Sequence, residues 1–146
     1  MNLPTQYQWL QSAGTLPRMI DMAISLLGTK EIVGRGSNRT IMEWSNELRR
    51  AGVDGLDQYS NDDIAWCGLF VAILAFRRRG IVTEVVNEPL WARNWADYGD
   101  PIAKRSTGKL VFSDDKRASL GDVLVFERGN GGHVALYIAE DSMSYH

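Results

Sequence analysis

One apolar stretch decides the fold of this chain, and it reads Trp66-Cys67-Gly68-Leu69-Phe70-Val71-Ala72-Ile73-Leu74-Ala75-Phe76-Arg77-Arg78-Arg79-Gly80. Its large apolar side chains recur at helical spacing, and the glycine that follows the arginines is a helix stop signal. We therefore predict a helix with Cys67, the only cysteine of the chain, at or just inside its N-terminus. Unpaired backbone N–H groups and the helix dipole stabilise negative charge there, which favours a thiolate.

Two interpretations of Cys67 are open. A lone cysteine before an apolar helix can be a buried structural thiol, because free cysteine packs like a small apolar residue. A distant segment, Gly131 to Ala139, favours a reactive thiol instead, because it predicts an apolar strand with His133 near its start. Cysteine nucleophiles need a nearby base of this kind. His133 could also be structural, but it is one of two histidines, and the two glycines before it would leave room for a substrate.

The composition indicates one globular domain over residues 1–146, with 45% hydrophobic residues and a sizeable core. A net charge of −2 gives no electrostatic footprint for nucleic acid. One cysteine excludes a disulfide framework and fits a reducing compartment. No secretory signal and no run of the ~20 apolar residues that a membrane span needs are visible. We expect a monomer made in the cytoplasm, without membrane insertion.

The order of the predicted elements indicates the α+β class, because helices come first and an antiparallel sheet last. Residues 1–14 are predicted to form an arm or a short helix. A first helix is predicted to begin near Thr15 and to end at Gly28. A second is predicted to be capped by Ser37 or Asn38 and to end at Gly52, and a short third one to cover the aromatic residues from Leu90 to Tyr98. The predicted strands are Lys109–Phe112, Val123–Phe126 and His133–Ala139.

Two loops resemble ligand sites without meeting their requirements. Val33 to Gly36 contains two glycines but lacks the spacing and the Lys-Ser/Thr pair of a phosphate-binding loop. Val53 to Asp63 contains four aspartates, but its glycine and glutamate are misplaced for an EF-hand. We therefore predict no cofactor and no metal.

The motifs together resemble a known enzyme group: the papain-like cell-wall peptidases of the NlpC type and their CHAP relatives (cysteine, histidine-dependent amidohydrolase/peptidase), in particular small phage lytic enzymes. The resemblance runs from about Leu16 to the end of the chain. The segments that carry it are Leu27–Glu31, Tyr59–Gly68, Ala92–Trp95 and Gly121–Glu140.

The resemblance implies a papain-like fold in which the Cys67 helix packs on a C-terminal antiparallel half-barrel and His133 faces Cys67. It implies hydrolysis of amide bonds in peptidoglycan stem peptides or cross-bridges, with Cys67 as nucleophile and His133 as base and then acid. In NlpC-type enzymes a polar residue on the next strand orients the imidazole. Either His146, 13 positions after His133, has this role, or the chain ends before the segment that supplies the residue.

The flanks of Cys67 depart from the Asp-Cys-Ser-Gly of NlpC-type sequences, because Trp66 and Gly68 stand there. This puts recognition of a free amine in the substrate in doubt. Candidate substrate-binding residues are Tyr59, Asp62, Asp63, Trp66 and Trp95, although helix capping would explain the aspartates equally well.

Three functions remain open at this point. The first is a cysteine peptidase or amidase of peptidoglycan that acts on the cell wall after release or delivery. The second is a cysteine amidohydrolase, such as a deamidase toxin, that acts on a protein or a small molecule. The third is a non-catalytic wall-binding module with an inert papain-like shell.

Overall fold

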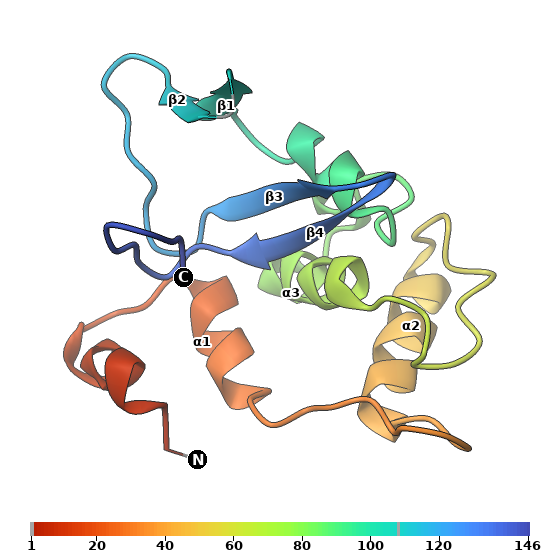
Figure 1. The fold of residues 1–146 in the computed structure, drawn as a ribbon. Coiled ribbons are helices and arrows are strands. Elements are labelled where there is room, and N and C mark those ends of the chain that lie inside the picture. Colours follow the sequence, from red (N-terminus) through yellow and green to blue (C-terminus); the bar gives the residue numbers. More distant parts are fainter. Residues whose placement is uncertain (1, 108) are drawn as a thin grey trace.

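The structure is a computed structural model that describes residues 2–107 and 109–146. It has the α+β architecture that the patterns predict, with helices before strands (Figure 1). The helical elements are the 3₁₀ helix η1 (Thr5–Ser12), α1 (Arg18–Ser25), α2 (Arg39–Ala51), α3 (Cys67–Arg79), and the 3₁₀ helices η2 (Val82–Glu84) and η3 (Ala92–Asp97). The strands are β1 (Ala103–Ser106), β2 (Lys109–Phe112), β3 (Val123–Arg128) and β4 (Gly131–Leu136).

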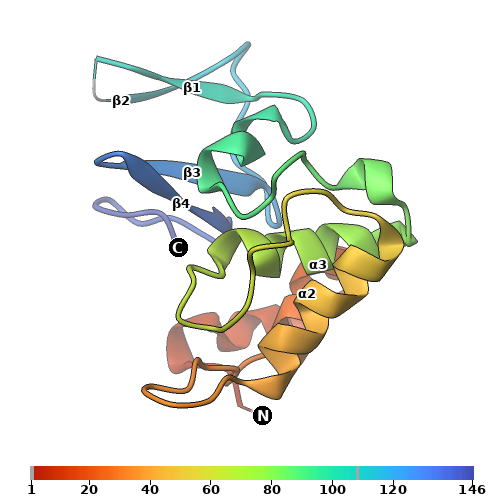
Figure 2. The same ribbon diagram turned by 90° about the vertical axis from the view of Figure 1, so that its right-hand side faces the viewer.

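Helix α3 is the central element of the fold. Its residues from Leu69 to Ala75 are buried with the exception of Phe70, which is half-buried. A helix that is apolar on all sides must be covered on all sides, and here α1, α2 and β4 all contact it (Figure 2). The predicted helix at Cys67 is therefore confirmed, and it ends at Gly80 in the left-handed conformation.

The second helix, α2, also follows its sequence signals. The Asn38 side chain accepts hydrogen bonds from the backbone N–H groups of Thr40 and Ile41, as an N-cap does. Gly52, at φ 91°, ends the helix in the left-handed region that glycine tolerates. The first helix, α1, differs from the prediction at both ends. It begins at Arg18, after Pro17, with no side-chain cap, so Thr15 lies outside it, and it ends at Ser25, before Gly28.

The arginines at the end of α3 connect neighbouring elements. Arg77 donates two hydrogen bonds to Glu47 of α2, at 3.0 and 2.6 Å. The hydrogen bond from Arg77 lowers the pKa of the Glu47 carboxyl. Arg78 pairs with Glu84 of η2. These two contacts fasten α3 to α2 and to η2.

The strands pair antiparallel, but they form two separate two-stranded sheets in the described residues and not one continuous half-barrel. Strand β3 pairs with β4 so that Phe126 lies opposite His133. The hairpin turn is shorter than predicted, because Arg128 already pairs with Gly131 and only two residues, with Gly129 at φ 52°, connect the strands. The other sheet pairs β2, which has the predicted bounds, with β1, a strand that the sequence did not reveal.

The C-terminal residues fold back beside the end of β4. His146 donates its backbone N–H to the Ala139 carbonyl at 2.8 Å, and its carbonyl accepts from Ile138 at 2.6 Å. A bridge between Glu140 and Tyr145 continues this pairing. Residues 144–146 therefore return beside the segment after β4 as an isolated bridge and not as a further strand.

In the part of the chain that the structure describes, no helix combines the length and the apolar character that crossing a bilayer requires.

Candidate active site

Cys67 and His133, the two residues on which the mechanism depends, line the same cavity. The cavity has a volume of about 510 Å³ and lies between the start of α3, strand β4, helix α1 and the N-terminal segment. Both residues are half-buried. The structure therefore places two residues that are 66 positions apart in the sequence on the walls of one cavity.

The start of α3 leaves backbone donors free beside Cys67. Trp66 is the N-cap residue, and its side chain accepts no hydrogen bond from the helix. The first helical bond runs from the Phe70 N–H to the Trp66 carbonyl at 2.8 Å. The N–H groups before Phe70 precede the helical ladder, and such groups bind anions.

Gly68 has a packing reason to be glycine. A Cβ built at this position would overlap the carbonyl oxygen of Pro89. The same carbonyl accepts a hydrogen bond from the indole N–H of Trp95 at 2.9 Å. The loop at Pro89 is therefore pressed against the first turn of α3, directly beside Cys67.

Arg93 holds the hairpin that carries His133. Its guanidinium donates hydrogen bonds to the Gly131 carbonyl at 2.7 Å and to the Gly129 carbonyl at 2.6 Å. Helix η3 thus supports both halves of the candidate pair, since Arg93 holds the β3–β4 turn and Trp95 holds the loop against Gly68. This role of Arg93 was not predicted from the sequence, although the residue stands within one of the segments that resemble the lytic enzymes.

The glycine before His133 also serves internal packing. A Cβ at Gly132 would lie 2.7 Å from the Phe126 carbonyl oxygen and 3.2 Å from Cγ of Arg93. The space beside this glycine is therefore filled by β3 and η3. The expectation that it leaves room for a substrate is wrong for Gly132.

The surroundings of His133 favour its neutral form. Burial lowers the pKa of the His133 imidazole, and the positive charge of Arg128 lowers it further. A neutral imidazole can accept a proton from a thiol. No hydrogen bond joins Cys67 to His133 among the described residues, and catalytic hydrogen bonds are often long before substrate binds.

His146 has partners other than His133. One ring nitrogen, Nδ1, lies 3.2 Å from the Tyr7 hydroxyl, and Nε2 lies 2.8 Å from Oδ2 of Asp141. The hydrogen bond with His146 keeps the pKa of the Asp141 carboxyl well below its usual range. His146 is not among the residues that line the cavity. The structure therefore uses its imidazole to connect the N-terminal segment to the C-terminal turn.

The predicted substrate-binding residues divide into three kinds. Trp66 lines the cavity, as expected. Tyr59 and Trp95 have packing roles, because their exposed fractions are only 2% and 1%. Burial raises the pKa of the Tyr59 hydroxyl well above its usual range.

The two aspartates before Cys67 differ from each other. Asp62 is fully buried, and its Oδ2 accepts hydrogen bonds from the backbone N–H groups of Ile32 at 2.8 Å and Asn38 at 2.7 Å. These bonds lower its pKa and tie the loop before Cys67 to the start of α2. Asp63 is exposed. Neither residue lines the cavity, and neither caps α3.

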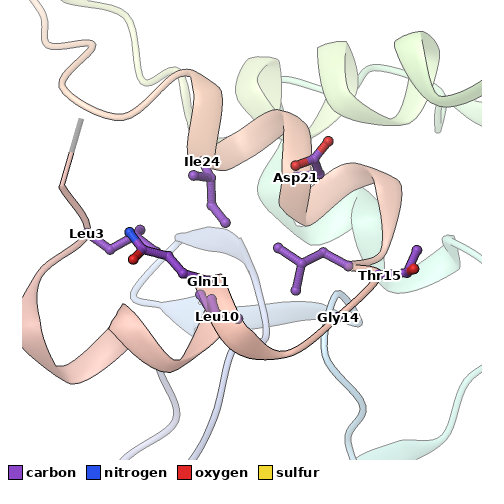
Figure 3. Close-up of a pocket in the computed structure, with 8 residues that line it drawn as sticks. Leu3, Leu10, Gln11, Gly14, Thr15, Asp21 and Ile24 are labelled. Atoms are coloured by element: carbon purple, nitrogen blue, oxygen red, sulfur yellow. The ribbon is translucent and has the colours of Figure 1, made fainter.

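The N-terminal segment forms a wall of the cavity, which the sequence did not indicate. Leu3 and Leu10 are buried, and together with Tyr7 they line the cavity opposite α3 and β4. A second hollow, of about 540 Å³, lies between η1 and α1 (Figure 3). Leu3, Leu10 and Ile24 line both spaces, so these three side chains form part of the wall between the two hollows.

Among residues 2–107 and 109–146, no group of three or more His, Cys, Asp or Glu side chains is placed to hold a metal ion. The comparisons with known proteins found nothing similar, since no protein family, no curated protein and no solved structure matches this chain.

Proposed function

We propose that this protein is a cysteine hydrolase that cleaves amide bonds, with Cys67 as nucleophile and His133 as base and acid. The observation that carries the proposal is that both residues line one reachable cavity, with Cys67 at the start of a helix. A structural cysteine would need neither the histidine nor the opening.

The proposed reaction has two steps. His133 accepts the Cys67 proton, and the thiolate sulfur attacks the amide carbonyl. The C–N bond then breaks, the amine leaves with the proton from His133, and a thioester to Cys67 remains. A water molecule, deprotonated by His133, hydrolyses the thioester and releases the carboxylic acid and the free thiol.

The start of α3 supports the transition state in this proposal. Negative charge develops on the carbonyl oxygen during both attacks, and backbone N–H groups stabilise such an oxyanion. The Cys67 N–H lies in the first turn of α3, and the side chain of the N-cap residue accepts no hydrogen bond from this turn. The same backbone atoms would thus serve acylation and deacylation.

The substrate that we propose is peptidoglycan, cut in a stem peptide or a cross-bridge. This part rests on the likeness of the Cys67 and His133 segments to the NlpC-type and CHAP enzymes and on the papain-like arrangement that they imply. We propose that the protein acts on the cell wall after release or delivery, in the manner of small phage lytic enzymes.

Mass spectrometry of muropeptides tests this proposal. Purified peptidoglycan is digested with the wild-type protein and with Cys67→Ala, and new amine and carboxyl termini are identified. We expect defined fragments with the wild type and none with the variant. Equal digestion by both proteins, or none by either, would contradict the proposal.

A second candidate is an amidohydrolase that acts on a small molecule or a protein side chain. The observation in its favour is the apolar lining of the cavity, which suits a short uncharged group. Release of ammonia without cleavage of wall peptides would favour this candidate, and new peptide termini would favour the first.

A further inference from the structure

We propose that the cavity beside Cys67 binds the acyl side of the substrate, and that this acyl group is uncharged and aliphatic. The inference rests on the proposed function only for the role of Cys67 as the acyl acceptor. It adds the chemical class of the group that occupies the cavity.

The side chains that line the cavity carry almost no charge. None of the side chains that line the cavity belongs to Asp, Glu, Lys or Arg. Apart from the reacting pair Cys67 and His133, the lining offers an ionised group no ionic partner, and the loss of hydration of such a group is unfavourable. A charged acyl group is therefore expected to be rejected.

Aliphatic side chains from several elements line the cavity. Ile24 and Leu27 reach it from α1 and the turn that follows. Leu136 lies on β4, and Ile138 is the second residue after that strand. Leu10 adds a third side from η1. An aliphatic group would be enclosed by these walls, and burial of each methylene favours binding.

The cavity is larger than one small side chain needs. Since a water molecule occupies about 30 Å³ in the liquid, a cavity of about 510 Å³ holds on the order of fifteen groups of that size. This is more than one alanine methyl requires. The volume fits two or three small uncharged residues or an acyl chain of several carbons.

In peptidoglycan peptides the inference restricts the bond that is cut. Alanyl residues carry an uncharged methyl side chain, whereas glutamyl and diamino-acid residues carry charge. We therefore expect the carbonyl of the scissile amide to come from alanine. A simple acyl amide is the other source of the same chemistry, and the experiment separates the two.

The test measures binding without turnover. Isothermal titration calorimetry on Cys67→Ala compares butanamide, hexanamide and octanamide with glutaramate, which is short and charged, and with N-acetyl-alanyl-alaninamide. We expect the Kd to fall roughly fourfold per added methylene, from about 0.8 kcal/mol of apolar transfer for each. Glutaramate is expected to bind at least roughly tenfold more weakly than butanamide, because its charge would be buried unpaired.

A matched pair of variants places the ligand. Ala23 lines the cavity from α1, and Ala96 is exposed on η3. In the Cys67→Ala background, Ala23→Leu fills part of the cavity and should weaken octanamide more than butanamide, whereas Ala96→Leu should leave both Kd values unchanged. If Ala23→Leu fails to fold, the methyl NMR signals of Leu27 and Leu136 give the same information on addition of octanamide.

The outcomes separate this inference from the proposed function. Tighter binding of the alanyl peptide than of octanamide identifies a peptide acyl donor, and the reverse identifies an acyl chain; both support the inference. A Kd that does not depend on chain length, or glutaramate binding as well as butanamide, overturns it. Because the protein under test lacks Cys67, a failure of catalysis in the wild type does not affect these results.

Discussion

At the scale of the residue, the protonation of His133 is set by two effects that act in the same direction. Burial is the larger effect and the charge of Arg128 the smaller one, and both lower the pKa of the imidazole. The neutral, proton-accepting form therefore persists to lower pH than for a free histidine, whose pKa is about 6.5.

This gives a prediction for the pH dependence of the reaction. Arg128→Gln removes the repulsion of the imidazolium, so the pKa of His133 should rise and the acid limb of the kcat/KM profile should move to higher pH. Arg35→Gln is the control, because Arg35 is exposed and has no influence on the pKa of His133. An acid limb that stays in place in Arg128→Gln, or moves to lower pH, would exclude His133 as the group that is titrated.

A second residue-scale prediction concerns Gly68. In a helix, Gly→Ala ordinarily stabilises by about 1 kcal/mol. At Gly68 the added Cβ would overlap the Pro89 carbonyl, and overpacking costs about 1–3 kcal/mol or more, so steric overlap should outweigh propensity. We expect Gly68→Ala to lower the Tm in thermal unfolding and to reduce activity. Gly131→Ala is the control, because the atom nearest to a Cβ at this position, the Arg128 carbonyl oxygen, lies 3.7 Å away. An unchanged or raised Tm in Gly68→Ala would contradict a steric role of Gly68.

At the scale of the element, η3 is the support that both halves of the site share. Arg93→Met keeps the aliphatic stem but removes the hydrogen bonds to the Gly129 and Gly131 carbonyls. The expected loss of stability is about 1 kcal/mol, because these bonds are exposed. We expect kcat to fall more than KM rises, with faster amide hydrogen exchange in β3 and β4. Arg93→Lys should recover part of kcat. Equal kinetics for Arg93→Met and wild type would show that η3 does not position His133.

The N-terminal segment is the other element whose role can be measured. Leu10 is 3% exposed and lines both hollows beside η1, whereas its neighbour Trp9 is 44% exposed. We expect Leu10→Ala to cost about 2–5 kcal/mol in denaturant unfolding, as large buried side chains do. Trp9→Ala should cost much less. If the two substitutions lower the free energy of unfolding by the same small amount, η1 does not form the packed wall of the cavity that the structure indicates.

At the scale of the whole molecule, most local signals predicted the structure correctly, although those at the two ends of the first helix did not. The Asn38 cap, the Gly52 and Gly80 ends and the bounds of β2 all follow from residues within a turn or a strand. The placement of Cys67 at a helix start also belongs here. These features depend on backbone propensity and periodicity, which a short window of sequence contains.

The features that the sequence did not reveal depend on distant contacts. Asp62 was considered for substrate binding, but it is buried, and the backbone N–H groups that bind its carboxylate lie 24 and 30 positions upstream. Arg93 acts on a turn 36 to 38 positions away. Strand β1 was missed because it is short and mostly exposed, with no alternation of apolar residues to mark it.

If Cys67 and His133 work as a pair, the rate of alkylation of Cys67 depends on His133. Since the chain has a single cysteine, mass spectrometry after iodoacetamide treatment reports on this thiol alone. Near pH 6, where a free thiol with a pKa of about 8.5 is almost unreactive, we predict that wild-type Cys67 reacts at least roughly tenfold faster than Cys67 in His133→Ala. Equal rates in the two proteins, both as slow as a free thiol, would contradict the account.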